Sequence, residues 1–194
     1  LLQMSTGIRG EMTFTVFIGG DIGAWNILSV APVTGDSLMP ASHLAIAPCT
    51  ALSDASATTP WQLRGVTSHV RYVERAEKIA LTSVQAGLGR TEATRAALIP
   101  IRKPAAWWEL TQDERRKVFE DKSHHIAASL KYLPAIARQL YHCRDLGEPF
   151  DFLTWFEYAP EHAAMFEDLV GMLRATEEWT YVEREIDIRL ARAT

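Results

Sequence analysis

The stretch WTYVEREIDIRL, residues 179–190, decides the fold, because polar and apolar side chains alternate along it. One face of the extended chain carries Arg184 and the apolar side chains Val182, Ile186, Ile188 and Leu190. The other face carries Tyr181, Glu183, Glu185, Asp187 and Arg189. Successive side chains of a strand point to opposite faces, so this pattern predicts an antiparallel strand that is buried on one face only.

Two further elements precede this strand. Residues 161–174 follow Pro160, which suits the first turn of a helix, and they carry apolar side chains at helical spacing. These inward-facing residues are Phe166, Leu169, Val170 and Leu173. Residues 151–158 alternate in character and predict a strand.

The region before residue 150 adds one strand and two helices. Residues 96–101 form a short apolar run, which indicates a strand. Thr111 and Glu114 have the spacing of a capping box, so a helix is expected to begin there. A second helical pattern runs to about Tyr141, and Pro134 within it predicts either a kink or a late start of the helix. The resulting order, strand–helix–helix–strand–helix–strand, is close to a ferredoxin-like unit.

The first half of the chain resembles a truncated version of the second. Residues 13–18, 24–30 and 61–73 indicate strands, residues 74–86 a helix, and residues 47–59 a loop. The prediction is an α+β fold with a reduced N-terminal half, residues 12–95, and a C-terminal half, residues 96–194. This duplication is inferred from the order of elements, since no sequence repeat is visible.

The composition is that of an ordinary globular protein. Of the 194 residues, 47% are hydrophobic and 23% are charged, which excludes a disordered or collagen-like chain. The formal net charge of −4 lacks the basic surplus that a nucleic-acid-binding protein needs. No run is long and apolar enough for a membrane helix, so neither nucleic acid nor membrane is an expected partner. Two cysteines are too few for a disulfide framework.

Residues 1–11 have no basic region followed by an apolar block, so they are not an intact signal peptide. We expect them to be a leader, vector-derived residues or a short tail. The expected location is the cytoplasm, or the periplasm if these residues replace a cleaved signal.

Common catalytic motifs give no reaction. The sequence contains no GxSxG, GxGxxG, HExxH or phosphate-binding loop, and neither cysteine belongs to a CxxC pair. Of the six histidines, only His124 and His125 lie between two helical patterns, and neighbours about 100° apart on a helix cannot both face the core. Trp107 and Trp108 fit either core packing or the wall of a flat cofactor. The residues alone predict an α+β domain with a pocket.

Several segments in a fixed order carry a family resemblance: WQLRGVTSHVRYV at 61–73, RAEK at 75–78, LGRTEATRAALIPIRK at 88–103, AAWW at 105–108, DER at 113–115, residues 132–142 and FDFLTWFE at 150–157. They resemble the chlorite dismutase family, and the similarity extends from about residue 13 to the C-terminus. The short chain resembles the compact branch, which forms homodimers. The resemblance implies a dimeric α+β barrel of two ferredoxin-like halves. It also implies haem b (iron protoporphyrin IX) in the C-terminal half and conversion of chlorite to chloride and dioxygen.

The resemblance also assigns the site residues. It makes His125 the proximal iron ligand and His124 a neighbour of that ligand. Glu178 would accept a hydrogen bond from the imidazole, Lys103 would join that network, and Arg138 would be the distal arginine. Trp107 and Trp108 would take the haem and interface positions.

These residue types suit the implied chemistry. A carboxylate on the second ring nitrogen makes an axial imidazole more electron-donating, which favours a ferryl state. Arg138 cannot act as a base, but it can hold chlorite, other small anions and the hypochlorite leaving group. A helix of thirteen residues from His125 to Arg138 would span about 20 Å. The fold also implies alternatives: a coproheme decarboxylase, whose branch lacks the distal arginine, a haem peroxidase, or a haem-binding module without turnover.

Overall fold

The computed structural model describes residues 14–49, 59–67, 74–84 and 86–193. Within these ranges eight antiparallel strands close into a barrel, with the ring order β1-β3-β2-β8-β5-β7-β6-β4. The strands are β1 (Phe14–Gly20), β2 (Trp25–Thr34), β3 (His43–Cys49), β4 (Trp61–Thr67), β5 (Arg95–Arg102), β6 (Ala137–His142), β7 (Phe152–Tyr158) and β8 (Arg184–Arg192). The predicted α+β fold is confirmed. The expected leader, residues 1–11, lies outside the described residues.

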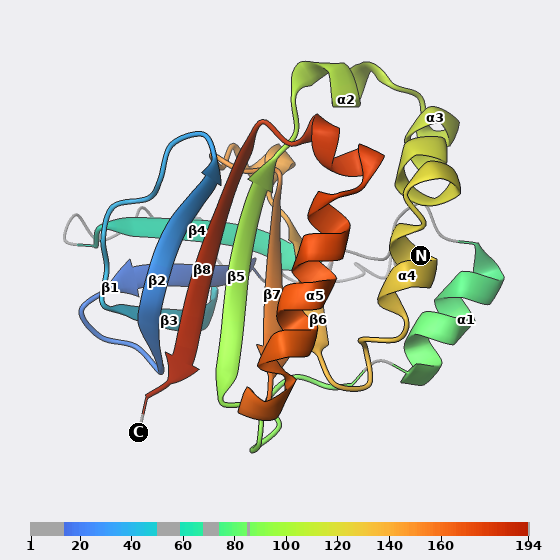
Figure 1. The fold of residues 1–194 in the computed structure, drawn as a ribbon. Coiled ribbons are helices and arrows are strands. Elements are labelled where there is room, and N and C mark those ends of the chain that lie inside the picture. Colours follow the sequence, from blue (N-terminus) through green and yellow to red (C-terminus); the bar gives the residue numbers. More distant parts are fainter. Residues whose placement is uncertain (1–13, 50–58, 68–73, 85, 194) are drawn as a thin grey trace, which may run out of the picture.

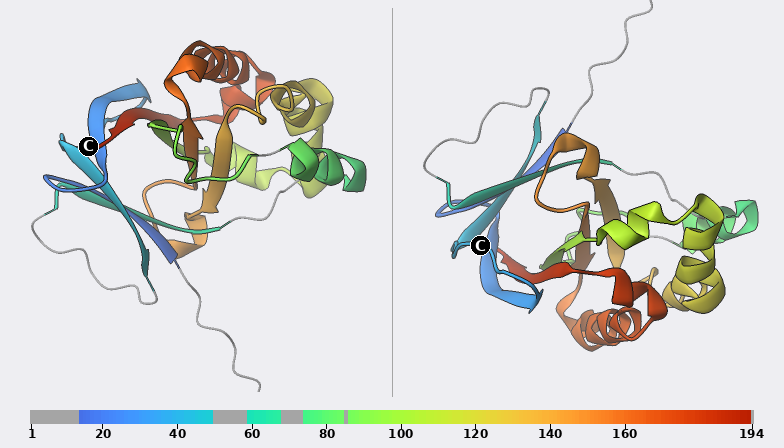
Figure 2. Two further views of the ribbon diagram at one scale, coloured as in Figure 1. Left: turned by 90° about the horizontal axis from the view of Figure 1, so that it is seen from below. Right: turned by 90° about the horizontal axis from the view of Figure 1, so that it is seen from above.

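The helices gather on one side of the barrel (Figure 1; Figure 2). They are α1 (Arg75–Val84), α2 (Ala105–Glu109), α3 (Gln112–Arg116), the π-helix η1 (Lys117–Lys122), α4 (His125–Ser129) and α5 (Ala163–Arg174). The described residues also form the 3-10 turns η2 (Arg144–Leu146), η3 (Pro160–His162) and η4 (Glu177–Tyr181). No described helix combines the length and the apolar character that a membrane crossing requires.

Both halves of the barrel have the same strand order. Numbered within its own half, each set of four strands follows 4-1-3-2: β4-β1-β3-β2 and then β8-β5-β7-β6. This is the order of a ferredoxin-like unit. In the first half, residues 21–24 alone join β1 to β2, which leaves no room for a helix. The division into residues 12–95 and 96–194 stays a prediction.

Two apolar layers hold the fold together. The barrel interior is filled by large side chains, among them Phe17, Trp25, Trp155 and Ile188. A second layer lies between the outer face of the sheet and α5, whose Phe166, Leu169, Val170 and Leu173 are buried as predicted. Burial of apolar surface in both layers is the main stabilising contribution.

Strand β8 differs from its prediction in two ways. It begins at Arg184, because residues 177–181 form the turn η4 instead. It is also buried on both faces, since Glu185 and Asp187 lie beneath α5 and accept hydrogen bonds from Arg174. The alternating pattern predicts that these charged side chains face solvent, but their ion pairs allow them to be covered.

The predicted helix up to Tyr141 is wrong. Helix α4 ends at Ser129, and residues 137–142 form β6, which pairs with β7 and with β4. Pro134 lacks an amide hydrogen and its ring clashes with a preceding turn, which disfavours a continuous helix. The predicted loop over 47–59 also begins too early, because β3 continues to Cys49; residues 50–58 of that loop and 68–73 of the predicted strand over 61–73 lie outside the described residues.

Candidate functional site

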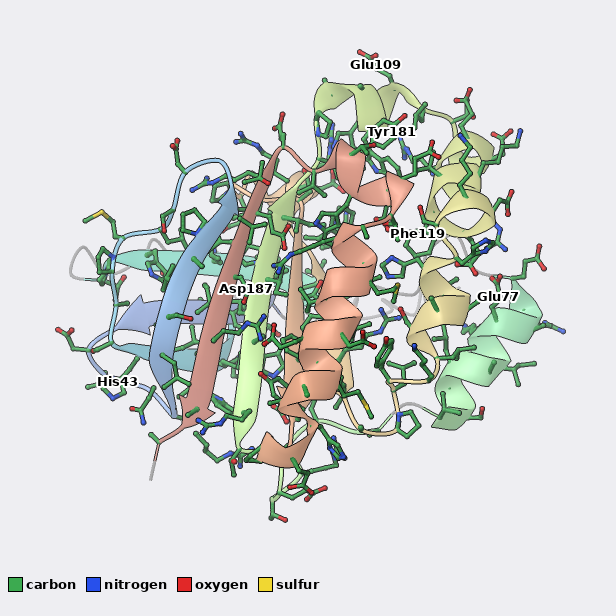
Figure 3. The ribbon with its side chains drawn as sticks, viewed as in Figure 1. His43, Glu77, Glu109, Phe119, Tyr181 and Asp187 are labelled. Atoms are coloured by element: carbon green, nitrogen blue, oxygen red, sulfur yellow. The ribbon has the colours of Figure 1, made fainter. Side chains whose placement is uncertain are left out.

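A large cavity separates the outer face of the sheet from the helices. It encloses about 1400 Å³, counted with its open mouth, and its lining is mostly apolar. The sheet contributes side chains from β5, β6 and β7, while α4, α5, η1 and η4 form the opposite walls. Figure 3 shows this region, with Phe119 labelled between α5 and the helices around α4. The few charged or titratable groups in the lining therefore stand out.

Three of these groups form a buried hydrogen-bonded array. His125 is the first residue of α4, and its Nδ1 lies 2.8 Å from Oε2 of Glu178 in η4. The other carboxylate oxygen of Glu178 accepts a hydrogen bond of 2.9 Å from Nζ of Lys103, which follows β5. The His125 imidazole and the Lys103 ammonium group therefore bind different oxygens of the Glu178 carboxylate.

The electrostatics of the array determine which ring nitrogen carries the proton. Burial by itself would raise the pKa of the Glu178 carboxyl, but Lys103 and His125 outweigh this effect and lower the pKa to about 2. Glu178 is therefore an anion at neutral pH and acts only as an acceptor. Nδ1 of His125 must donate, so in the neutral imidazole Nε2 carries the lone pair.

Neighbouring residues hold the array in place. The Ser123 hydroxyl accepts a hydrogen bond of 3.0 Å from the backbone amide of Glu178 and donates to the Val118 carbonyl. The Phe119 ring stacks on the His125 imidazole, with centroids 4.3 Å apart and an interplanar angle of 24°. Asp151 accepts a hydrogen bond of 2.7 Å from the backbone amide of Lys103.

The two adjacent histidines occupy different environments. His124 has the left-handed backbone conformation, with φ of 49°, and its side chain is exposed. His125 lines the cavity, whereas His124 is not among the lining residues. The turn at His124 therefore directs the next residue inward.

Arg138 enters the cavity from the sheet. It lies on β6 opposite Phe156, which places both side chains on the outer face of the barrel. Burial lowers the pKa of the Arg138 guanidinium from its usual value of 12.5, yet an arginine starts so high that it remains charged at neutral pH. The expected helix from His125 to Arg138 does not exist, and the two residues belong to opposite walls, one helical and one of sheet.

The two tryptophans separate. Trp107 is buried and lines the cavity; its ring lies 4.4 Å from Nζ of Lys103 and 5.3 Å from the Tyr181 ring. Trp108 is not part of the lining; it stacks on Phe152 with centroids 6.0 Å apart and lies 3.8 Å from the Arg144 guanidinium. The structure therefore brings five of the six predicted site residues to one cavity and leaves Trp108 behind its wall.

The donor set of the cavity suits a flat, metal-centred macrocycle. The described residues contain no group of three His, Cys, Asp or Glu side chains able to hold a metal ion. A metal here would take one ligand from Nε2 of His125 and the others from a macrocycle, which the apolar walls would cover. Sequence reasoning missed Phe119, Glu120 and Ser123, because nothing in the residue spacing predicts the π-helix that carries the first two.

Comparison with known proteins gives consistent matches. Residues 49–194 match the family model described as chlorite dismutase. A curated chlorite dismutase from Ideonella dechloratans is 34% identical over 97 residues, which span 49% of this chain and 33%, about a third, of that protein.

Solved structures extend the likeness to nearly the whole chain. The crystal structure of dimeric chlorite dismutases from Nitrobacter winogradskyi is 85% identical, with a TM-score of 0.85, and the match covers 92% of this chain and 99% of that one. A mutant chlorite dismutase from Candidatus Nitrospira defluvii in complex with cyanide is 20% identical, with a TM-score of 0.71 over 95% and 92% of the two chains. At that identity the second structure supports the fold alone.

Proposed function

Because the chain belongs to the chlorite dismutase family, we propose that it is a haem b enzyme that converts chlorite to chloride and dioxygen. The observation that carries this proposal is the His125–Glu178–Lys103 array, which faces the same apolar cavity as Arg138. An oriented imidazole on one wall and a permanent cation on the other suit an iron cofactor that acts on an anion.

His125 would hold the cofactor through Nε2, and Trp107, Phe156 and Leu169 would form part of its apolar surroundings. When bound, haem b would supply a redox-active iron for the conversion of chlorite to chloride and dioxygen. Glu178 keeps the proton on Nδ1 and increases the electron donation of the imidazole. Lys103 holds Glu178 in place and in its charged form.

Arg138 would bind chlorite and keep the oxychlorine anion, hypochlorite included, inside the cavity until chloride and dioxygen leave. Charge-assisted hydrogen bonds from a guanidinium suit a small anion with several oxygen atoms. Conversion of one chlorite ion to one chloride ion and one dioxygen molecule consumes no net proton. A distal group that holds charge without exchanging protons therefore matches this stoichiometry.

The Nitrobacter winogradskyi relative is dimeric, and we infer that this chain also forms a homodimer. Its partners are then a second copy of the chain, chlorite and other small anions.

The test is an oxygen-electrode measurement on protein loaded with ferric haem b. We expect a Soret band at full occupancy and the release of one dioxygen per chlorite. If full occupancy gives no dioxygen, the proposal is wrong, and oxidation of a dye by hydrogen peroxide would then test the haem peroxidase alternative.

A further inference from the structure

We propose that Glu120 is a positioning residue for His125: its buried carboxylate fixes the first turn of α4 and thereby the direction of the imidazole. This inference rests on the proposed function, because it concerns the residue that would hold haem b. It adds a residue outside the His125–Glu178–Lys103 array and outside the cavity lining.

The contacts of Glu120 are directed at the backbone of α4. Oε2 accepts a hydrogen bond of 2.6 Å from the amide of Ile126, and Oε1 accepts one of 3.2 Å from the amide of Ala127. Both amides lie in the first turn of the helix, where backbone donors have no partner within the helix. Glu120 therefore caps α4 with both oxygens, in the region where the helix dipole favours a negative charge.

The residue at the usual capping position, His124, does not cap the helix with its side chain. His124 immediately precedes α4, has a φ of 49° and makes no side-chain hydrogen bond to the helix. Its own amide donates a hydrogen bond of 2.8 Å to the Glu120 carbonyl. Backbone and side chain of Glu120 thus hold both sides of the left-handed turn.

The length of α4 makes this cap important. The helix contains only residues His125–Ser129, so it has little internal hydrogen bonding to define its direction. His125 is its first residue, and a small rotation there would move Nδ1 away from the Glu178 carboxylate at 2.8 Å.

The same short segment contacts the array at two other points. Phe119, beside Glu120 in the π-helix η1, stacks on the imidazole, and Ser123 at the end of η1 accepts the amide hydrogen of Glu178. A π-helix changes the angular spacing of side chains. Here it allows Phe119 to stack on the imidazole while the next residue, Glu120, binds the backbone of α4. The segment from Phe119 to Ser123 therefore supports the ligand and its carboxylate partner together.

The experiment compares Glu120→Gln with Glu114→Gln. Glu114 makes the same kind of contact at another helix, where its carboxylate accepts a hydrogen bond of 2.7 Å from the Thr111 amide outside the cavity lining. A neutral amide side chain has a single oxygen acceptor, so Glu120→Gln loses one of the two contacts to α4. Haem b is titrated into each apo-protein, and the Fe(III)/Fe(II) potential of each loaded protein is measured.

For Glu120→Gln we expect about tenfold weaker haem b binding, as is usual for residues that orient a ligand. We also expect a higher potential, because a poorly directed imidazole donates less charge to the ferric ion. Glu114→Gln should bind within twofold of wild type with an unchanged potential. If Glu120→Gln does not fold, Glu120→Asp, which is shorter by one methylene, replaces it with the same expectations.

If the Glu120 variant matches Glu114→Gln in affinity and potential, Glu120 only stabilises the fold and the positioning role is wrong. A lower melting temperature without a change in haem b affinity or potential would likewise contradict the positioning role. If wild-type protein binds no haem b, both the proposed function and this inference are wrong. If wild-type protein binds haem b and only the Glu120 comparison fails, the inference alone is wrong, so the two failures are distinguishable.

Discussion

At the scale of single residues, Arg138 supplies positive charge to the sheet wall of the cavity. We expect Arg138→Ala to retain haem b but to lower kcat/KM for chlorite by about ten- to a hundredfold, since hydrogen bonds to a charged group contribute about 1.5–3 kcal/mol. Oxygen release at several chlorite concentrations measures the effect. Arg144→Ala is the matched control, because Arg144 lies against Trp108, which is outside the lining. Equal kinetics in the two variants would contradict the role of Arg138.

His125 and His124 allow a paired test of the proximal ligand. We expect His125→Ala to weaken haem b binding by more than about tenfold, with recovery of the Soret position when free imidazole is added. His124→Ala should bind like wild type, because its side chain is exposed. Spectral titration of both apo-proteins makes the comparison, and a reversal of the two results would move the ligand to position 124.

The site residues were predictable only through the family resemblance. Residue types alone left His124 and His125 equivalent, because the positive φ of His124 decides which of them faces inward. The contact between His125 and Glu178 joins positions 53 apart, a pairing that no local spacing rule provides. The placement of Trp108 behind Phe152 depends on tertiary packing, so the sequence pattern did not predict it either.

At the scale of elements, α5 and β8 are joined by a half-buried ion-pair cluster. Burial opposes ionisation of the Asp187 carboxyl, but its hydrogen bonds to Arg189, assisted by Arg174, prevail and hold its pKa below the usual 3.8. Because the pKa of Asp187 is lower in the folded than in the unfolded chain, its ionisation stabilises the fold. This stabilisation is fully present at pH values above the pKa of the unfolded chain, and it is lost as the pH falls through the pKa of the folded chain.

Asp187→Asn should therefore destabilise the protein by about 1.5–3 kcal/mol at neutral pH, because Arg174 and Arg189 each lose one of two carboxylate partners. The difference from wild type should shrink as the pH falls below about 4. Urea unfolding at a series of pH values measures this change. A difference that is constant between pH 7 and pH 3 would show that the carboxylate charge is irrelevant.

Elements were predictable where the spacing of apolar side chains agreed with the long-range pairing, and they were not where the two disagreed. Helix α5 and strand β7 followed from regular spacing of apolar side chains. Residues 137–142 carry apolar side chains at helical spacing, yet they form a strand, because this segment pairs with both β7 and β4. Such long-range pairing overrides local preference, and a single sequence does not display it.

At the scale of the whole molecule, closure of the barrel depends on Gly65 in β4. A Cβ atom at this position would lie 2.7 Å from the Cβ of Tyr141 in β6, so a side chain there would push the two strands apart. We expect Gly65→Ala to lower the free energy of unfolding by about 1–3 kcal/mol.

Gly171 in α5 is the control, because a Cβ atom there meets nothing within 4 Å. Alanine at this helical position should stabilise the protein by about 0.5–1 kcal/mol. Chemical denaturation of both variants provides the measurement, and a neutral Gly65→Ala would mean that the strands can separate without cost.

The strands of the barrel differ in how far they pair with their neighbours, and this difference affects the cooperativity of unfolding. β1 pairs along its length with β3 on one side and with β4 on the other. Within the described part of the chain, β3 joins β2 only at Trp25–Leu44 and Asn26–His43, and β4 joins β6 only at Val66–His142 and Thr67–Tyr141. By contrast, β2 pairs with β8 over nearly its whole length. Heating should therefore release the three-stranded flap before the remainder melts, giving a calorimetric enthalpy larger than the van't Hoff enthalpy.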